Sequence, residues 1–168
     1  ETSSHREGFL FETIQAYEII LANGDLLRVT KDSHPDLFYT LPWSHGTLGF
    51  LVAVELEIEP VQSHVKLEYI PCQSMEEFVL KFSALADADE PVHFLEGLVF
   101  GPHKGVIMTG EYASPEGSDK NKINPINRWY KPWFYSHVAT YLQKEDSTKQ
   151  HYEYIPMRQY FHRHTPSV

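Results

Sequence analysis

Residues 14–30 read Ile-Gln-Ala-Tyr-Glu-Ile-Ile-Leu-Ala-Asn-Gly-Asp-Leu-Leu-Arg-Val-Thr, two runs rich in strand-forming residues on either side of Asn23-Gly24. An Asn-Gly pair accepts positive φ at both central positions of a type I′ turn, and the twist of that turn suits two antiparallel strands. We therefore predict a β-hairpin over residues 14–30 with a type I′ turn at its tip.

A short helix is predicted directly after this hairpin, over residues 33–39. Asp32 or Ser33 is placed to act as its N-cap, and Pro35 falls in its first turn, where the missing N–H costs nothing. We expect the helix to end before Pro42.

A cleanly alternating segment runs from Phe50 to Pro60, after a turn over residues 43–49 that contains two glycines. Alternation with a period of two indicates a half-buried strand. We expect one face to carry Val52, Val54, Leu56 and Ile58 and the other to carry Glu55, Glu57 and Glu59. Pro60 closes the segment, so we place a domain boundary near residue 61.

The second part of the chain reads β-α-β-β. Residues 64–70 alternate as a strand, and Ser74 with Glu77 resembles a capping box at the start of a helix. The apolar stripe of that helix is Phe78, Val79, Phe82, Leu85 and Ala86. Residues 92–100 and 106–112 are predicted to form a second hairpin, and the polar residues 114–127 a solvated loop. This order of elements predicts an α+β fold.

The composition is that of a globular protein and excludes several classes. The chain has 168 residues, 42% of them hydrophobic, and a net charge of −9, which argues against nucleic-acid binding. Cys72 is the only cysteine, so an internal disulfide is impossible and a reducing compartment is favoured. No apolar run approaches the roughly 18 residues of a membrane span. Because the chain starts at Glu1, we expect it to be a piece of a longer protein.

Aromatic residues concentrate near the end of the chain. Ten of them fall within residues 129–161, from Trp129 to Phe161. Such a concentration suits either a packed interface or a pocket for a flat apolar ligand, and the sequence does not choose between the two.

Three groups of residues are candidates for a functional site. Ser3-Ser4-His5 has small hydroxyl residues that bring backbone N–H groups close to a phosphate or a ring edge, although a frayed terminus explains the same residues. Gly46-Thr47-Leu48-Gly49 permits close approach of a ligand to the backbone, but it matches neither a dinucleotide fingerprint nor a P-loop, and a plain tight turn also accounts for it.

The third group is Tyr160-Phe161-His162-Arg163-His164. In a strand, His162 and His164 would face the same side, which permits a metal pair or an acid/base site. Zinc needs three or four ligands and no further ligand stands at a suitable spacing, so we predict no metal site. A solvated basic turn is the plainer interpretation, and a proton donor or anion anchor is the functional one.

Several blocks in this order make the chain similar to the delta(24)-sterol reductase family, the 24-dehydrocholesterol reductases and their plant relatives, over essentially all 168 residues. The blocks are Glu1–His5, Ala16–Glu18, Asp36–Tyr39, Pro42–Val52, Glu96-Gly97, Met108–Gly110, Tyr130–Phe134, Tyr154–Arg158 and Tyr160–Thr165.

This resemblance implies a flavoenzyme with the vanillyl-alcohol-oxidase-type (PCMH) FAD-binding fold. Residues 1–60 would be the closing half of the FAD-binding domain, and residues 61–168 the opening part of a β-α-β-β substrate cap. The resemblance places Glu1 and Thr2 at the end of the loop around the FAD pyrophosphate, and Ser4 and His5 along the flavin. It also makes Gly46, Gly49 and Val52 cofactor-binding residues.

The implied reaction is reduction of the C24=C25 double bond of a sterol side chain. NADPH reduces FAD, the flavin delivers hydride to one alkene carbon, and an acid protonates the other. We predict Tyr160, His162 or His164 as the proton donor, because titratable groups cluster there among aromatic rings. The resemblance further implies a cytosol-facing endoplasmic reticulum membrane protein, anchored by a segment outside this chain.

Two features limit the match. The upstream FAD-binding residues and most of the cap are absent, so the chain alone is expected to be inactive, and Pro166-Ser167-Val168 departs from the family pattern. Two other functions stay open: a flavin oxidase of the same fold, and a non-catalytic module whose aromatic tail binds a lipid or a protein partner.

Overall fold

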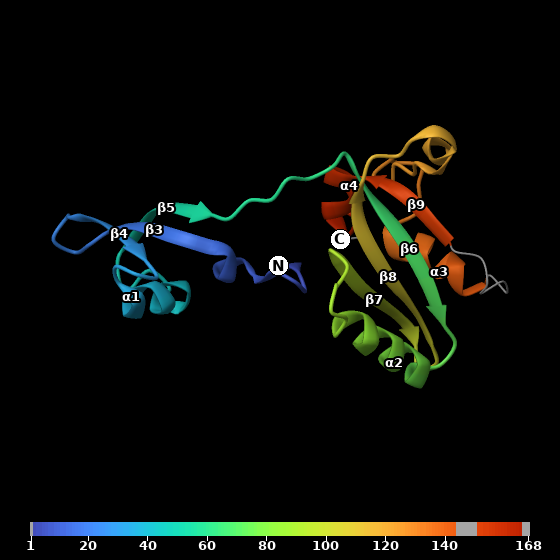
Figure 1. Ribbon diagram of the computed structural model, residues 1–168, viewed down its shortest axis with the longest axis horizontal. Helices are drawn as coiled ribbons and strands as arrows, with labels where there is room; N and C mark the ends of the chain where they lie inside the picture. The colour runs from blue at the N-terminus through green and yellow to red at the C-terminus, as the bar shows by residue number, and fades with distance from the viewer. Residues whose placement is uncertain (1, 144–150, 166–168) are drawn as a thin grey trace. The chain divides into compact units, whose positions relative to one another are not determined.

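The computed structural model describes residues 2–143 and 151–165 and divides into two compact units, Glu1–Pro60 and Val61–Val168. Each unit combines antiparallel strands with short helices, which confirms the predicted α+β class (Figure 1). The division falls where the sequence analysis places a boundary. The assignment of the two parts to an FAD-binding domain and a substrate cap stays a prediction.

The first unit is built on a three-stranded antiparallel sheet in the order β4-β3-β5. Its strands are β3 (Ile14–Ile20), β4 (Leu26–Thr30) and β5 (Phe50–Leu56), preceded by a small pair, β1 (Thr2–Ser4) and β2 (Gly8–Phe9). The helical segments are η1 (Leu10–Thr13), α1 (Pro35–Thr40) and η2 (Leu41–Trp43). Its core is Ile14, Tyr17, Ile19, Val29 and Phe38.

The predicted hairpin is present as β3 and β4, but its turn type is different from the prediction. Gly24 has a φ of 89°, whereas Asn23 is not among the residues with positive φ, so a type I′ turn is wrong. Gly24 N donates to Leu21 O and Leu21 N donates to Asp25 O. This is the longer hairpin loop in which only the glycine is left-handed, and the Asn23 side chain instead bonds Asp25.

The predicted first helix is also present, with a different N-cap. His34 occupies the N-cap position of α1 and makes no side-chain cap bond. Ser33 Oγ instead accepts from Thr30 N at 3.1 Å, which binds it to the end of β4. Pro35 does lie in the first turn, as predicted.

β5 is an edge strand whose residues are all exposed in this chain, so the prediction of a half-buried strand is wrong. Its pairing with β3 is irregular: Glu18 lies opposite Ala53 and Ile19 opposite Leu51, which leaves Val52 as an extra residue. One extra residue reverses the faces of the strand beyond it. Leu51 therefore shares a face with Val54 and Leu56, and the sequence alternation wrongly gave that place to Val52.

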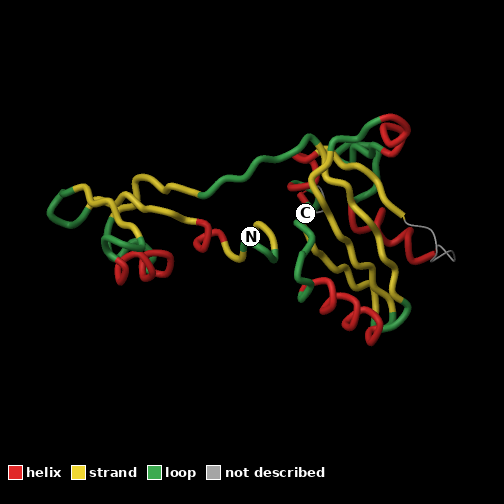
Figure 2. Tube along the Cα trace, in the orientation of Figure 1, coloured by secondary structure: helices red, strands yellow, loops and turns green. Residues whose placement is uncertain are grey.

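The second unit contains a four-stranded antiparallel sheet in the order β7-β8-β6-β9. The predicted β-α-β-β order is confirmed by β6 (His64–Cys72), α2 (Met75–Ala86), β7 (Phe94–Gly101) and β8 (Lys104–Ala113). After these come η3 (Gly117–Lys122), α3 (Phe134–Ala139), η4 (Thr140–Gln143), β9 (His151–Pro156) and α4 (Met157–Phe161), as Figure 2 shows by colour.

Helices cover both faces of this sheet. On one face, Phe78 of α2 lies against two glycines: a Cβ at Gly97 would come 2.5 Å from Phe78 Cζ, and one at Gly105 2.6 Å from Phe78 Cδ2. The start of α2 is capped as predicted, since Glu77 N donates to Ser74 Oγ at 3.1 Å. The Glu77 carboxylate accepts from Gln73 N, one residue before the expected partner.

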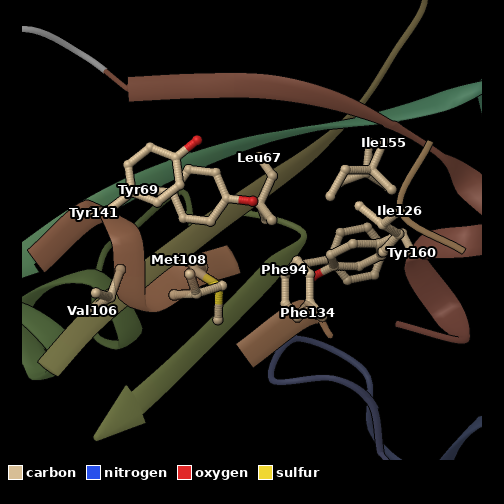
Figure 3. Packing of buried hydrophobic residues seen from close by; sticks show 12 residues of the cluster. Leu67, Tyr69, Phe94, Val106, Met108, Ile126, Phe134, Tyr141, Ile155 and Tyr160 are labelled. Carbon is tan, nitrogen blue, oxygen red and sulfur yellow. The ribbon is translucent and has the colours of Figure 1, made fainter. Parts of the chain in front are cut away.

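The main core lies on the other face, under α3, η4 and α4 (Figure 3). Val65, Leu67 and Tyr69 of β6 are buried there, as the alternation predicts. Residues 114–127 are not simply a solvated loop, because Ile126 joins this core. Asp119 of η3 also accepts hydrogen bonds from Tyr152 and Tyr154 of β9.

Candidate functional site

An apolar groove of about 880 Å³ lies in the first unit. It lies beside the sheet face that β3 and β5 share. The lining residues are Phe9, Leu10, Phe11, Ile14, Tyr17, Leu41, Pro42, Trp43, Ser44, His45, Gly46, Gly49, Phe50, Leu51, Val54 and Leu56. A concave, mostly apolar site of this size with few polar groups is the usual form of a ligand or cofactor site.

The turn over residues 43–49 forms one wall of the groove and exposes its backbone there. His45 and Gly46 both have positive φ, 49° and 79°, and no atom lies within 4 Å of the place where a Cβ on Gly46 would stand. Thr47 closes the turn, since its N and Oγ1 both donate to Ser44 O. A ligand can therefore approach the backbone at Gly46 without meeting a side chain.

Gly49 has a different reason to lack a side chain. A Cβ at this position would lie 3.0 Å from Ile20 O and 3.2 Å from Ile19 Cδ1. Gly49 thus lets the turn pass close to β3 as the chain enters β5, and it also lines the groove.

Tyr17 lines the groove and carries an unpaired polar group beneath its surface. The residue is only 4% exposed, and its hydroxyl is buried with no hydrogen-bond partner among the described residues. Burial raises the pKa of Tyr17, so at neutral pH the phenol keeps its proton. A buried hydroxyl without a partner costs free energy, so an acceptor atom that reached the Tyr17 hydroxyl would gain a hydrogen bond. The groove thus fits a largely apolar ligand that also carries polar atoms.

The other residues predicted to bind a cofactor do not line the groove or are not described. Glu1 lies outside the described residues, and Thr2 and Ser4 lie in β1. His5 is exposed in the turn after β1 and does not line the groove. Val52 is the bulge residue of β5 and does not line it either. Of the predicted set, the structure brings Gly46 and Gly49 together in one site.

The predicted proton donors belong to the second unit and do not form a strand. Tyr160 lies in α4, His162 is its C-cap, and His164 lies in the following turn, so the expected same-side pair of histidines is wrong. Tyr160 is 2% exposed and packs in the core against Phe94, with ring centroids 5.1 Å apart. Burial raises its pKa well above the usual value for tyrosine.

Glu96 of β7 binds Arg163 and His164, which follow α4. Arg163 Nε and Nη2 lie 2.9 and 2.6 Å from Glu96 Oε2, and His164 Nε2 lies 2.8 Å from Glu96 Oε1. Arg163 also stacks on the Tyr160 ring, 4.2 Å from its centroid. Of the three predicted donors, His164 is the one that a carboxylate orients.

Sequence reasoning missed Tyr17 and the aromatic wall of the groove, Phe9, Phe11 and Trp43. Phe11 stacks on Phe9 and meets Trp43 edge to face, with centroids 5.6 and 5.4 Å apart. The available signal for Tyr17 was its place in Ala16-Tyr17-Glu18, one of the resemblance blocks. Within residues 2–143 and 151–165, the structure shows no group of three or more potential metal ligands and no helix long and apolar enough to span a membrane.

Comparison of the sequence with known proteins places the chain in a family. No protein-family model matches the chain. Delta(24)-sterol reductase of Arabidopsis thaliana is 45% identical to it over 98% of the chain, and Delta(24)-sterol reductase of Homo sapiens is 43% identical over 100%. The chain belongs to the delta(24)-sterol reductase family.

The chain spans about 30% of the length of these curated sterol reductases. A more distant relative, FAD-linked oxidoreductase sorD of Penicillium rubens, is 26% identical over 83% of the chain. The groove and the group formed by Glu96, Arg163 and His164 therefore both belong to a stretch of the delta(24)-sterol reductase sequence that plants and animals share.

Proposed function

We propose that the whole protein reduces the C24=C25 double bond of a sterol side chain, with FAD as its bound cofactor and NADPH as its electron donor. The observation that carries this proposal is the similarity, along the full chain, to plant and animal proteins named Delta(24)-sterol reductase. The name of the fungal relative, an FAD-linked oxidoreductase, supports the choice of FAD.

The first unit, in this proposal, is the closing half of a vanillyl-alcohol-oxidase-type FAD-binding domain, and the second opens the substrate cap. Gly46 and Gly49 would present backbone groups to FAD, and Tyr17 would donate its hydroxyl hydrogen to an acceptor atom of the cofactor. The apolar walls, among them Phe11 and Trp43, would keep water from the site. Bound FAD supplies the hydride chemistry, and the protein supplies position and a proton.

His164 is our preferred proton donor among the three candidates. A general acid works best when its pKa lies near the operating pH, and histidine is the side chain that meets this condition most often. The raised pKa of buried Tyr160 makes its phenol a poor acid. Glu96 holds the His164 ring in one orientation. Among the described residues, no carboxylate orients the His162 ring in this way.

We further propose that the whole protein resides at the endoplasmic reticulum membrane and faces the cytosol, anchored by a segment outside this chain. A membrane location suits a substrate as apolar as a sterol. The sterol is the proposed substrate, and nucleic acid is not a proposed partner because the chain carries a net charge of −9.

The test is a chimera in which this chain replaces the matching segment of the Arabidopsis enzyme. We expect the purified chimera to show the visible absorption bands of bound flavin, to lose them when NADPH is added under nitrogen, and to regain them when a sterol with a C24=C25 double bond follows. A flavin oxidase would be favoured by a different result. NADPH would then leave the flavin oxidised, and oxygen would reoxidise the flavin after a substrate had reduced it. A folded but colourless chimera would favour a non-catalytic binding module.

Two substitutions in the chimera test the groove itself. Tyr17→Phe removes a hydroxyl that has no partner among the residues that the structure describes, so the fold should persist while FAD affinity falls about tenfold, the loss expected for one hydrogen bond. Gly46→Val should abolish flavin binding. Gly24→Val is its matched control, because Gly24 also has positive φ and open space around it but lies outside the groove. Equal flavin loss in the two glycine variants would refute a cofactor role for Gly46.

A further inference from the structure

A second cavity, of about 350 Å³, lies in the second unit between the turn before α3 and the segment after α4. Arg128, Trp129, Lys131, Trp133, Phe134 and Arg163 are among its lining residues. Neither the groove of the first unit nor the predicted proton donors include these side chains. The volume is at the lower end of the range for small-molecule sites, roughly 300–1,000 Å³, so it suits part of a dinucleotide better than a whole one.

A tight turn brings the two outer cations of this cavity together. Lys131 N donates to Arg128 O at 2.9 Å, which closes the turn over residues 128–131. Trp129 and Tyr130 occupy its tip, and Trp129 is 95% exposed. Tyr130 and Trp133 are also exposed, and several exposed aromatic rings close together mark an interaction site more than a single one would.

Positive charge in this cavity is only partly neutralised. Its lining contains three cations and no carboxylate, in a chain whose net charge is −9. Glu96 neutralises Arg163, but Lys131 Nζ bonds a neutral group, Asn124 Oδ1, at 2.8 Å. Arg128 has no ion-pair partner among the described residues. Two cations next to each other in one turn thus lack an anion.

Aromatic rings stand beside these free cations. Trp133 is 52% exposed, and it lines the cavity together with Trp129. Aromatic side chains stack on nucleic-acid bases, whereas Arg and Lys bind phosphate through charged hydrogen bonds. The combination of exposed rings and unpaired cations is the chemistry that recognises a base joined to a phosphate.

We propose that this cavity binds a phosphorylated nucleoside, whose base stacks on Trp129 or Trp133 and whose phosphate contacts Arg128 and Lys131. The inference rests on the proposed function in one respect: it assigns the ligand as the 2′-phosphoadenosine part of NADPH. The cations at the turn would then favour the phosphorylated dinucleotide over the unphosphorylated one.

The test is calorimetric titration of the 168-residue chain with 2′,5′-ADP and, separately, with 5′-AMP. We expect binding of 2′,5′-ADP, quenching of tryptophan fluorescence, and clearly weaker binding of 5′-AMP. Arg128→Gln combined with Lys131→Gln should weaken 2′,5′-ADP about tenfold or more and remove the preference over 5′-AMP. Trp129→Ala should weaken both nucleotides to a similar extent, because it removes stacking and leaves the charges.

Two matched controls separate this site from general effects. Lys120→Gln removes an exposed cation of η3, and Tyr130→Ala removes the other ring of the turn; neither residue lines the cavity. Both should keep 2′,5′-ADP affinity within about twofold of the unmodified chain.

Three outcomes would overturn the inference: no binding of either nucleotide, equal weakening by Lys120→Gln, or binding of vesicles rich in phosphatidylserine without binding of nucleotides. The last result would make the turn a membrane-contact surface. Failure here is distinguishable from failure of the proposed function, because flavin binding by the chimera does not depend on residues 128–131.

Discussion

At the scale of single residues, Glu153 is the only buried carboxylate among residues 2–143 and 151–165. Tyr69 donates to it at 2.6 Å, Asn124 at 2.8 Å, and His137 Nε2 lies 2.9 Å away. Burial acts to raise the pKa of Glu153, but these hydrogen bonds and the charge of His137 outweigh it, and the pKa is lowered. The ionised carboxylate therefore stabilises the second unit.

Glu153→Gln tests this effect and its pH dependence. Because the folded pKa is below the unfolded one, the stabilisation is fully present above about pH 4.5 and is lost as the pH falls through the folded pKa. We expect Glu153→Gln to lower the free energy of unfolding by about 1–3 kcal/mol at pH 7. The difference from the unmodified chain should shrink toward about pH 3 in urea titrations followed by circular dichroism.

Glu68→Gln is the matched control for that substitution. Glu68 also lies on the sheet, but it is more exposed and its ion pair with Lys66, 3.1 Å long, is a surface pair. Such pairs contribute about 0–1 kcal/mol, so its loss should change little. An equal loss of stability at pH 7 and at pH 3 for Glu153→Gln would contradict the role given to its charge.

At the scale of elements, the packing of α2 depends on two positions in the sheet without side chains. Gly97 and Gly105 admit the Phe78 ring, and a Cβ at Gly97 would lie 2.5 Å from it. Gly97→Ala should therefore destabilise the second unit by about 1–3 kcal/mol in the same urea titration. Gly101→Ala is the control in the same strand, because no atom lies within 4 Å of its Cβ position, and it should stay within about 0.5 kcal/mol.

Phe78→Leu identifies the cause of the Gly97 effect. If the collision with the ring is responsible, Gly97→Ala should cost clearly less in the Phe78→Leu background than in the unmodified chain. Additive losses would show that the alanine acts through the strand backbone instead.

At the scale of the whole molecule, this chain leaves much apolar surface uncovered on β5. Phe50 is 72% exposed and Leu51 is 51% exposed, and both line the groove. We expect the chain to bind the fluorescent dye ANS there, and Leu51→Lys with Val54→Lys to remove most of the fluorescence increase. Val79→Lys with Leu80→Lys, on the exposed side of α2, should leave it nearly unchanged, and a similar loss in both pairs would contradict binding in the groove.

Local sequence signals located several elements correctly where neighbours along the chain decide the structure. Asn23-Gly24 located the hairpin tip, Ser74 located the start of α2, and Val65, Leu67 and Tyr69 were correctly assigned to one buried face. Even so, the turn type and the N-cap of α1 came out differently. In both cases a side chain, Asn23 or Ser33, bonds a nearby residue that the local pattern did not single out.

Turn residues and hydrophobic periodicity act over short distances along the chain, so they were enough to predict the order of the elements and the boundary near residue 61. The blocks that the chain shares with its relatives can also be read from the residues alone. Long-range contacts decide that Leu51 rather than Val52 faces the groove and that Arg163 joins Arg128 and Lys131 at one cavity. They also leave the Tyr17 hydroxyl without a partner among residues 2–143 and 151–165. The physical reason is that strand register and side-chain contacts depend on residues far apart in the sequence, and a shift of one residue in β5 reverses which side chain enters the site.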